Sequence, residues 1–360
     1  MATSKPYRIR GTVLPEGDVR ELFVVDGRIT CNGVDDAETL LEDCVLLPGL
    51  VDVHAHLTMG SPAPPDATSE ERAADAATAH LDAGVLLIRE PGSPEHGSRG
   101  LSDANLPRVI TSGRFLAPPG HGVPGLELEV RADQLPEAAE TEFRTGGGWV
   151  KVIGDTFVPG PGITQTYPLD ALRATAQRIH DLGGRLAIHA MSAEAIAGAI
   201  EAGFDSIEHG TFMEQGQLAH LAAQGIAWTP TRSIDALVRS MVREMNWPTE
   251  AIADLDRGFD AQPAMVAAAV DAGVTILAGT DAGAVPHGTI GTEIALLREA
   301  GVPADLALGA ASWTARSFLG LPGIQEGAPA DLVVFREDPR TDLNVLREPA
   351  VRMLGGKLIL

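Results

Sequence analysis

Six polar residues of metal-binding or reactive type stand at the ends of short apolar segments, or inside them. Imidazole nitrogens and carboxylate oxygens bind zinc and similar divalent cations, and such cations can activate water for hydrolysis. A lone histidine of this kind is more often an ordinary core or loop residue. A whole set at equivalent positions favours one shared hydrolytic site. The residues are His54, His56, Lys151, His189, His209 and Asp281.

The sequence around four of these residues gives further information. His54 and His56 alternate, so on a strand both side chains lie on one face. Lys151 stands in the apolar run Trp-Val-Lys-Val, where a charged amine needs a reason. Either the amine extends to solvent from an edge strand, or it is neutral and modified. Asp281, in Gly-Thr-Asp-Ala-Gly, also fits a turn or a cap.

A repeated pattern predicts the elements that position these residues. Five times, an Ala-rich helical segment ends at glycine and an apolar run of strand length follows, as at Gly84, Gly203 and Gly273. Thr68 with Glu71 fits a capping box at a helix start. Alternating helices and parallel strands predict an α/β fold, either a closed (β/α)₈ TIM-like barrel or an open doubly wound sheet. The candidate strands are 50–56, 85–90, 108–112, 149–153, 185–190, 205–209, 226–230 and 274–280.

Eight strands favour the barrel, and no Gly-rich phosphate loop follows the first strand. In a barrel the reacting groups gather at the C-terminal ends of the strands, where the six residues fall. The sequence therefore predicts a barrel over residues 48–324 with its site at one end.

The two ends of the chain have another pattern. Short strands are predicted over 7–12, 21–25 and 27–31, and again over 330–335 and 351–360. Asp26-Gly27 and Gly355-Gly356 are hairpin turns. Neither end makes a stable sheet alone. We expect residues 1–47 and 325–360 to pair as one small composite β domain, a β-sandwich.

The composition limits the partners. The 360 residues are 44% hydrophobic and carry a formal net charge of −22, which disfavours nucleic acid and anionic membranes as partners. Cys31 and Cys44 form no disulfide framework, and no segment has the length of a membrane span or signal peptide. These features predict a reduced cytoplasmic protein, and the predicted site makes a small-molecule substrate its expected partner. The outer helices of a barrel offer surfaces for a homo-oligomer, and none of them stands out.

The order of the motifs resembles that of a known group of enzymes. LPGLVDVHAHL, WVKV, LAIHA, SIEHGT and LAGTDAG are similar to the metal-site motifs of the amidohydrolase superfamily, in its imidazolonepropionase-like and prolidase-like branch. The closing segment LGLPGIQEGAPADLVVF is similar to the stretch that leads many members back into their small β domain. Relatives usually have Arg-Asp where this chain has Arg89-Glu90, and often a polar residue at the position of Met191.

The resemblance implies a binuclear metal-dependent amidohydrolase. His54, His56 and Asp281 would bind one divalent cation, with zinc as the default, and His189 and His209 a second. Lys151 would carry a carbamate, formed from carbon dioxide, that bridges both. A metal-bridging hydroxide would attack the carbonyl, and Asp281 would move the proton to the leaving nitrogen.

Four further residues are weaker candidates for substrate binding. His121 lies in Pro-Pro-Gly-His-Gly, where relatives often have Gly-Gly-His-Gly, and could act as an electrophile or remain a loop histidine. His287 is comparable. Tyr167 and Arg232 could bind a carboxylate or lie on the surface. Strand alternation predicts that Glu208 faces away from the site.

Two alternatives to a binuclear hydrolase remain. A mononuclear zinc deaminase of a ring amidine would usually lack the lysine and have a glutamate soon after the fifth strand. Glu194 is the only nearby acid in this chain. A non-catalytic barrel scaffold would have lost ligands. For the hydrolase, an N-acyl amino acid, a dipeptide, a lactam or a cyclic imide would each fit as substrate.

Overall fold

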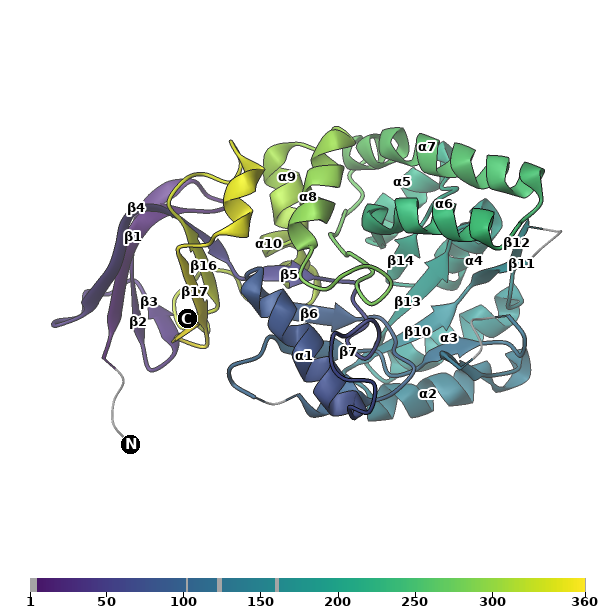
Figure 1. Cartoon of the computed structure of the whole chain (residues 1–360), viewed down its shortest axis with the longest axis horizontal. Coiled ribbons are helices and arrows are strands. Elements are labelled where there is room, and N and C mark those ends of the chain that lie inside the picture. Colours follow the sequence, from purple (N-terminus) through teal and green to yellow (C-terminus); the bar gives the residue numbers. More distant parts are fainter. Residues whose placement is uncertain (1–4, 102, 122–124, 159–161, 360) are drawn as a thin grey trace.

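Strands from both ends of the chain lie beside an α/β unit of parallel strands and helices (Figure 1). The computed structural model describes residues 5–101, 103–121, 125–158 and 162–359. The predicted α/β class with parallel strands is confirmed.

The two ends of the chain form one hydrogen-bonded sheet of seven strands in the order β18-β17-β16-β4-β1-β2-β3. A strand that was not predicted joins the ends, because β4 pairs parallel with β1 and antiparallel with β16. The first half of β4 is acidic and largely exposed, which hid it from the apolar pattern. The strands are β1 (Tyr7–Val13), β2 (Asp18–Val25), β3 (Arg28–Thr30), β4 (Glu38–Pro48), β16 (Leu332–Phe335), β17 (Val351–Leu354) and β18 (Lys357–Ile359).

Both faces of this sheet are apolar, because alternate residues at the end of β4 join two different apolar clusters. Cys44 and Leu46 join a small cluster made only by the sheet and residues leading into it. Val45 and Leu47 join the main core of the α/β unit. The second face thus fixes the sheet against the rest of the molecule.

The parallel strands of the α/β unit follow the predicted positions closely. They form the sheets β5-β6-β7 and β15-β14-β13-β10-β8-β9. The predicted third strand continues past its expected end, because β8 follows β7 after a short break and pairs with β10. The strands are β5 (Leu50–Asp52), β6 (Val85–Glu90), β7 (Arg108–Thr111), β8 (Phe115–Ala117), β9 (Glu127–Glu129), β10 (Trp149–Ile153), β13 (Arg185–Ala190), β14 (Ser206–His209) and β15 (Ala227–Thr229).

The predicted eighth strand, 274–280, is not a regular strand in the structure. It still bonds to neighbours on both sides. Leu277 N donates to Trp228 O at 3.0 Å, and Val53 N donates to Ala278 O at 3.1 Å. The segment therefore lies between β15 and the chain that follows β5.

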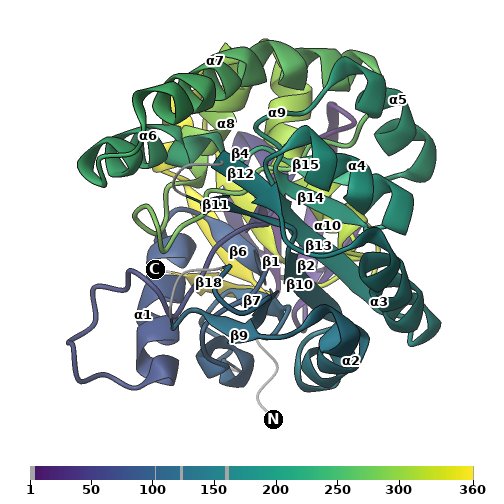
Figure 2. The ribbon, with the colours of Figure 1, turned by 90° about the vertical axis from the view of Figure 1, so that its right-hand side faces the viewer.

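Helices surround these strands (Figure 2). The capping box of Thr68 and Glu71 starts α1, and Gly203 ends α4 in the left-handed conformation, as predicted. After β10 the chain forms the hairpin β11 (Asp155–Val158) and β12 (Gly162–Gln165). No helix in the described ranges is long and apolar enough to cross a membrane. The helices are α1 (Ser69–Asp82), α2 (Leu135–Thr145), α3 (Leu169–Asp181), α4 (Ala193–Ala202), α5 (Gln215–Gln224), α6 (Asp235–Glu244), α7 (Thr249–Asp271), α8 (Ile290–Glu299), α9 (Ala304–Ala310) and α10 (Trp313–Phe318).

Candidate metal centre

The ends of the strands bring four of the predicted ligands into contact. Asp281 Oδ1 lies 3.0 Å from His56 Nε2 and 3.5 Å from His54 Nε2. The rings of His54 and His209 have centroids 5.1 Å apart. His189 extends the group, since its ring centroid lies 4.5 Å from that of His209. These side chains come from the ends of β5, β13 and β14 and from the segment after residue 280.

The cluster fits a divalent cation. One ligand atom each from His54, His209 and Asp281 lies within 4.8 Å of the others, and all three residues are buried. Two ligands on one zinc ion, each bound at about 2.1 Å, are at most about 4.2 Å apart, so small side-chain movements would close the site. The donors are imidazole nitrogens and a carboxylate, a set that suits zinc.

At three positions of the site the backbone adopts the left-handed conformation, which residues with a side chain rarely adopt. His209, Thr231 and Asp281 have φ values of 70°, 49° and 57°. Such left-handed positions are uncommon for residues other than glycine and cost free energy. Here they occur where β14, β15 and the eighth segment end, so the chain turns sharply just as each polar side chain is presented.

Glu208 holds His54 in place, and the prediction that it faces away from the site is wrong. Its Oε2 lies 2.7 Å from His54 Nδ1, and its Oε1 accepts from Arg89 Nη2 at 2.7 Å and from Ser206 Oγ at 2.5 Å. Glu208 and Arg89 are fully buried. Burial opposes ionisation of Glu208, but Arg89 and His54 outweigh it and keep the pKa of Glu208 well below its usual value. An ionised Glu208 accepts the proton of His54 Nδ1, which leaves Nε2 free to bind a metal.

Two of the other three histidines are also held by a hydrogen bond at one ring nitrogen. His56 Nδ1 lies 2.7 Å from Gly92 O, and His209 Nδ1 lies 2.7 Å from Thr231 Oγ1. In both rings the opposite nitrogen is left for a ligand role. Outer partners of this kind orient metal-binding imidazoles. His189 Nε2 lies 3.4 Å from Asp155 Oδ1 without forming a hydrogen bond to it.

The imidazoles of His54, His189 and His209 are neutral at neutral pH, as metal ligands must be. Burial lowers the pKa of His54 to about 4 and that of His209 to about 3. Burial also places the pKa of His189 well below its ordinary value.

Lys151 lies in an interior strand. In β10 it pairs with Phe115 of β8 on one side and with Ala187 of β13 on the other, and it is 1% exposed. This position excludes extension to solvent from a sheet edge, one of the two explanations for a lysine here. Burial lowers the pKa of the Lys151 amine to about 8, while Glu208 and Asp281 act in the opposite direction. A neutral fraction of the amine is therefore present at neutral pH.

The four weaker candidates lie in different surroundings. Tyr167 is buried in the main core and its hydroxyl donates to Val130 O, so the structure does not bring it to the ligand cluster. Arg232 donates to Leu296 O and pairs with Asp235.

Among the described residues, no hydrogen bond or ion pair joins His287 or His121 to the cluster, although the charge of His56 acts on His287. His287 Nδ1 lies 3.2 Å from Nε2 of the buried His80, for which no role was predicted. His121 is partly buried in the loop after β8.

Sequence reasoning missed Asp155, Glu208 and Arg89. A visible signal existed for Asp155, a polar residue just past β10, where the other site residues also fall. Glu208 and Arg89 lie inside strands, and their contacts depend on which strands are neighbours.

Comparison with known proteins agrees with this geometry. The model of the amidohydrolase family matches residues 45–359. An uncharacterized protein of Mycobacterium tuberculosis is 38% identical over 357 residues, 97% of this chain and 94% of that protein. The ochratoxinase of Aspergillus niger is 27% identical over 366 residues, covering 87% of this chain and 75% of that enzyme.

Solved structures show the same fold. The crystal structure of a Xaa-Pro dipeptidase with bound methionine in the active site superposes with a TM-score of 0.84 at 23% identity, covering 99% of this chain and 100% of that one. Neighbours of this kind have a TIM-barrel-like α/β fold. The match to the family model covers most of the chain, so this protein belongs to the amidohydrolase family and is a hydrolase of carbon–nitrogen bonds.

Proposed function

We propose that this protein is a binuclear metal-dependent amidohydrolase that cleaves an amide-type bond of a small molecule. The observation that carries the proposal is the buried cluster of His54, His209 and Asp281, with ligand atoms within 4.8 Å of one another. Each imidazole there is neutral and held by an outer hydrogen bond.

The residues would divide between two cations. His54, His56 and Asp281 would hold one, and His189 and His209 the other. A carbamate on Lys151 would connect them. The burial of Lys151 between two strands and its lowered pKa support this role, because only the neutral amine reacts with carbon dioxide. Zinc is the expected ion.

Divalent cations at these ligands supply Lewis acidity toward the scissile carbonyl and lower the pKa of bound water. Asp281 is the expected proton carrier of the chain. Its pKa lies below the ordinary value, since the neighbouring histidines outweigh the effect of burial, so it is ionised and can accept a proton. It would then deliver that proton to the leaving nitrogen.

The fold of the relatives supports the architecture that this mechanism needs. We propose a closed (β/α)₈ barrel over residues 48–324, and the backbone bonds of residues 274–282 to both neighbours support closure. We also propose that residues 1–47 and 325–360 make up one composite β domain that packs as a sandwich, and the apolar cluster of the described seven-stranded sheet supports this.

The substrate class follows from the proposed chemistry and the relatives. A dipeptidase and an ochratoxinase are among the similar proteins, which supports a screen of dipeptides and N-acyl amino acids, with lactams and cyclic imides beside them.

The test combines metal content with turnover. We expect elemental analysis of protein purified without chelators, in bicarbonate buffer, to give about two equivalents of zinc or a similar metal. We expect that protein to hydrolyse amides, and to lose activity on chelation and recover it with the metal. One equivalent with ammonia release from ring amidines would instead support a deaminase. No metal after reconstitution, and no turnover, would support a scaffold.

A further inference from the structure

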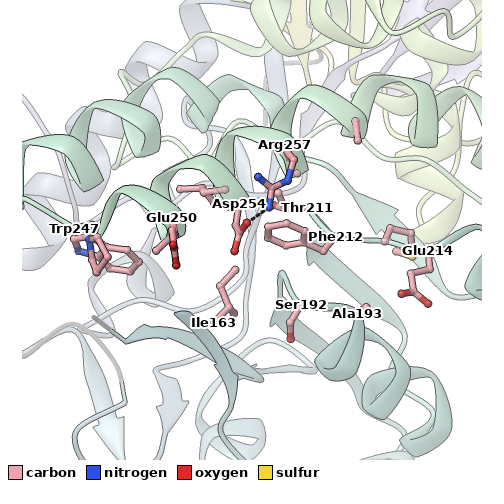
Figure 3. A pocket seen from close by; sticks show the side chains of 16 residues that line it. Ile163, Ser192, Ala193, Thr211, Phe212, Glu214, Trp247, Glu250, Asp254 and Arg257 are labelled. Carbon is pink, nitrogen blue, oxygen red and sulfur yellow. Dashed lines mark hydrogen bonds and ion pairs between the residues drawn. The ribbon is translucent and has the colours of Figure 1, made fainter. Parts of the chain in front are cut away.

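A second feature of the α/β unit is a pocket of about 760 Å³ beside the candidate metal centre (Figure 3). Its walls come from the starts of the loops after β13 and β14, from the turn before α7 and from one face of α7. None of the residues assigned above to metal binding or catalysis lines it.

The pocket lies within reach of the candidate ligands. Ser192 and Phe212 line it, and each follows a histidine of the cluster, His189 or His209, by three residues. Three residues span at most about 11 Å even when extended, so the wall lies within that distance of both histidine Cα atoms. Phe212 N donates to Met191 O at 2.8 Å, which fixes the two loops to each other. The pocket and the candidate ligands are thus close enough for one small molecule to reach both, which is the premise of the proposal below.

Part of the pocket lining is apolar and preformed. Phe212, Trp247 and Leu255 line it and belong to a packed apolar cluster that also contains Met191. Gly258 lets the ring of Phe212 pack against α7, because an added Cβ there would lie 2.6 Å from Phe212 Cε1. Apolar and aromatic walls of this kind favour burial of an apolar group.

The pocket lining also carries a net negative charge. Its charged residues are Glu214, Glu250, Asp254 and a single guanidinium, Arg257. Figure 3 shows Asp254 paired with Arg257 and Glu250 beside Trp247. The Glu214 side chain caps the start of α5, and Glu250 has no ion-pair partner among the described residues. Such a negative lining attracts an ammonium group and repels a carboxylate.

We propose that this pocket binds the apolar side group of the amide substrate, and that this group ends in a neutral or positively charged function, not a carboxylate. The proposal rests on the amide hydrolysis proposed above and narrows it. It favours amides whose apolar side group ends in an ammonium or in a neutral function over amides whose side group ends in a carboxylate, which the acidic residues of the pocket would repel.

Two probes that differ in charge but have similar shape test the pocket without turnover. We would measure the binding of 4-phenylbutylamine and of 4-phenylbutanoate to the metal-depleted full-length protein by calorimetry, so that the carboxylate cannot bind through a metal. We expect the amine to bind about tenfold more tightly than the acid, the size of effect expected from two partly exposed carboxylates. Equal binding, or tighter binding of the acid, would overturn the charge preference.

Two variants on α7, each with a matched control on the same helix, place the binding in this pocket. Glu250→Lys should abolish the preference for the amine, whereas Asp271→Lys, an exposed acid that does not line the pocket, should keep it. Ala261→Trp puts a large side chain at an exposed lining position and should weaken amine binding about tenfold, a substantial loss of free energy. Ala253→Trp, exposed but outside the pocket, should not. Unchanged binding in Ala261→Trp would show that the probe binds elsewhere and would reject the proposal.

Turnover separates this proposal from the proposed function. In the metal-loaded enzyme, Ala261→Trp should raise KM for an apolar aminoacyl amide and leave kcat for a small amide unchanged. Binding of the amine without hydrolysis of any amide would reject the proposed amidohydrolase activity but not the proposed binding pocket. Hydrolysis of apolar amides with the same KM in Ala261→Trp and wild type would reject the pocket.

Discussion

Glu208 Oε2 and His54 Nδ1 lie 2.7 Å apart, and both side chains are buried. Arg89 binds the other oxygen of Glu208 and also donates to Val53 O, one residue before His54. The orientation of a candidate metal ligand is thus set by a charged pair from β6 and β14. Removing one member leaves the other buried and uncompensated.

We expect Glu208→Gln to weaken metal binding by about 10- to 100-fold, because a neutral amide holds the His54 tautomer less firmly. Competition with a chromogenic chelator measures the affinity directly, apart from activity. Glu142→Gln, another buried glutamate but on α2, is the control and should bind metal normally. Wild-type affinity in folded Glu208→Gln would mean that the contact only supports the core.

We expect Lys151→Ala to lose most of its metal, because the expected anionic bridging ligand is gone. A small carboxylate such as propionate should restore part of the metal and activity by occupying the vacated space. Elemental analysis with and without propionate checks this. Lys357→Ala removes an exposed lysine and should behave as wild type. Two equivalents of metal and full turnover in Lys151→Ala would rule out the bridging carbamate.

We expect Asp281→Asn to bind metal less well and to lower kcat by about 100-fold or more at saturating metal, because an amide cannot accept the proton. Steady-state kinetics at several zinc concentrations separate the two effects. The exposed Asp271→Asn controls for the loss of one charge. Normal kcat at saturating metal would remove Asp281 from proton transfer.

A buried carboxyl outside the site predicts a pH dependence of stability. Glu293 of α8 accepts bonds from Arg232 N and Ser233 N, yet burial raises its pKa from 4.5 to about 7. Because the pKa of Glu293 is higher in the folded than in the unfolded chain, its contribution to stability is fully present below the unfolded-state pKa. That contribution is lost as the pH rises through about 7. Between about pH 5 and pH 8 the free energy of unfolding of the wild type should fall by on the order of 2 kcal/mol more than that of Glu293→Gln.

Urea unfolding in chelator measures this difference, so that metal binding does not contribute. Glu299→Gln, an exposed site at the end of the same helix, should keep the wild-type slope. An identical slope in Glu293→Gln would assign the pH dependence to other groups.

The sequence by itself determined the parallel α/β order and the identity of the candidate ligands. The bounds of β6, β10 and β13 were predicted as the structure has them. Buried parallel strands are continuous apolar runs that end at glycine and turn residues, so the sequence itself marks where they begin and end. The ligands were visible since their spacing places them at strand ends, a property of local sequence.

Only the tertiary structure decided what lies around those ligands. Strand β4 was missed because its stability comes from pairing with β1 and β16, which are more than 300 residues apart in the sequence, and not from an apolar pattern of its own. The direction of the Glu208 side chain was predicted wrongly from the alternation of residues along its own strand. Alternation cannot show that His54 and Arg89, which come from other parts of the chain, lie next to it. The pocket beside the centre likewise exists only where α7 crosses the loops after β13 and β14. Contacts between segments far apart in sequence depend on the packing of the whole chain, so no local pattern encodes them.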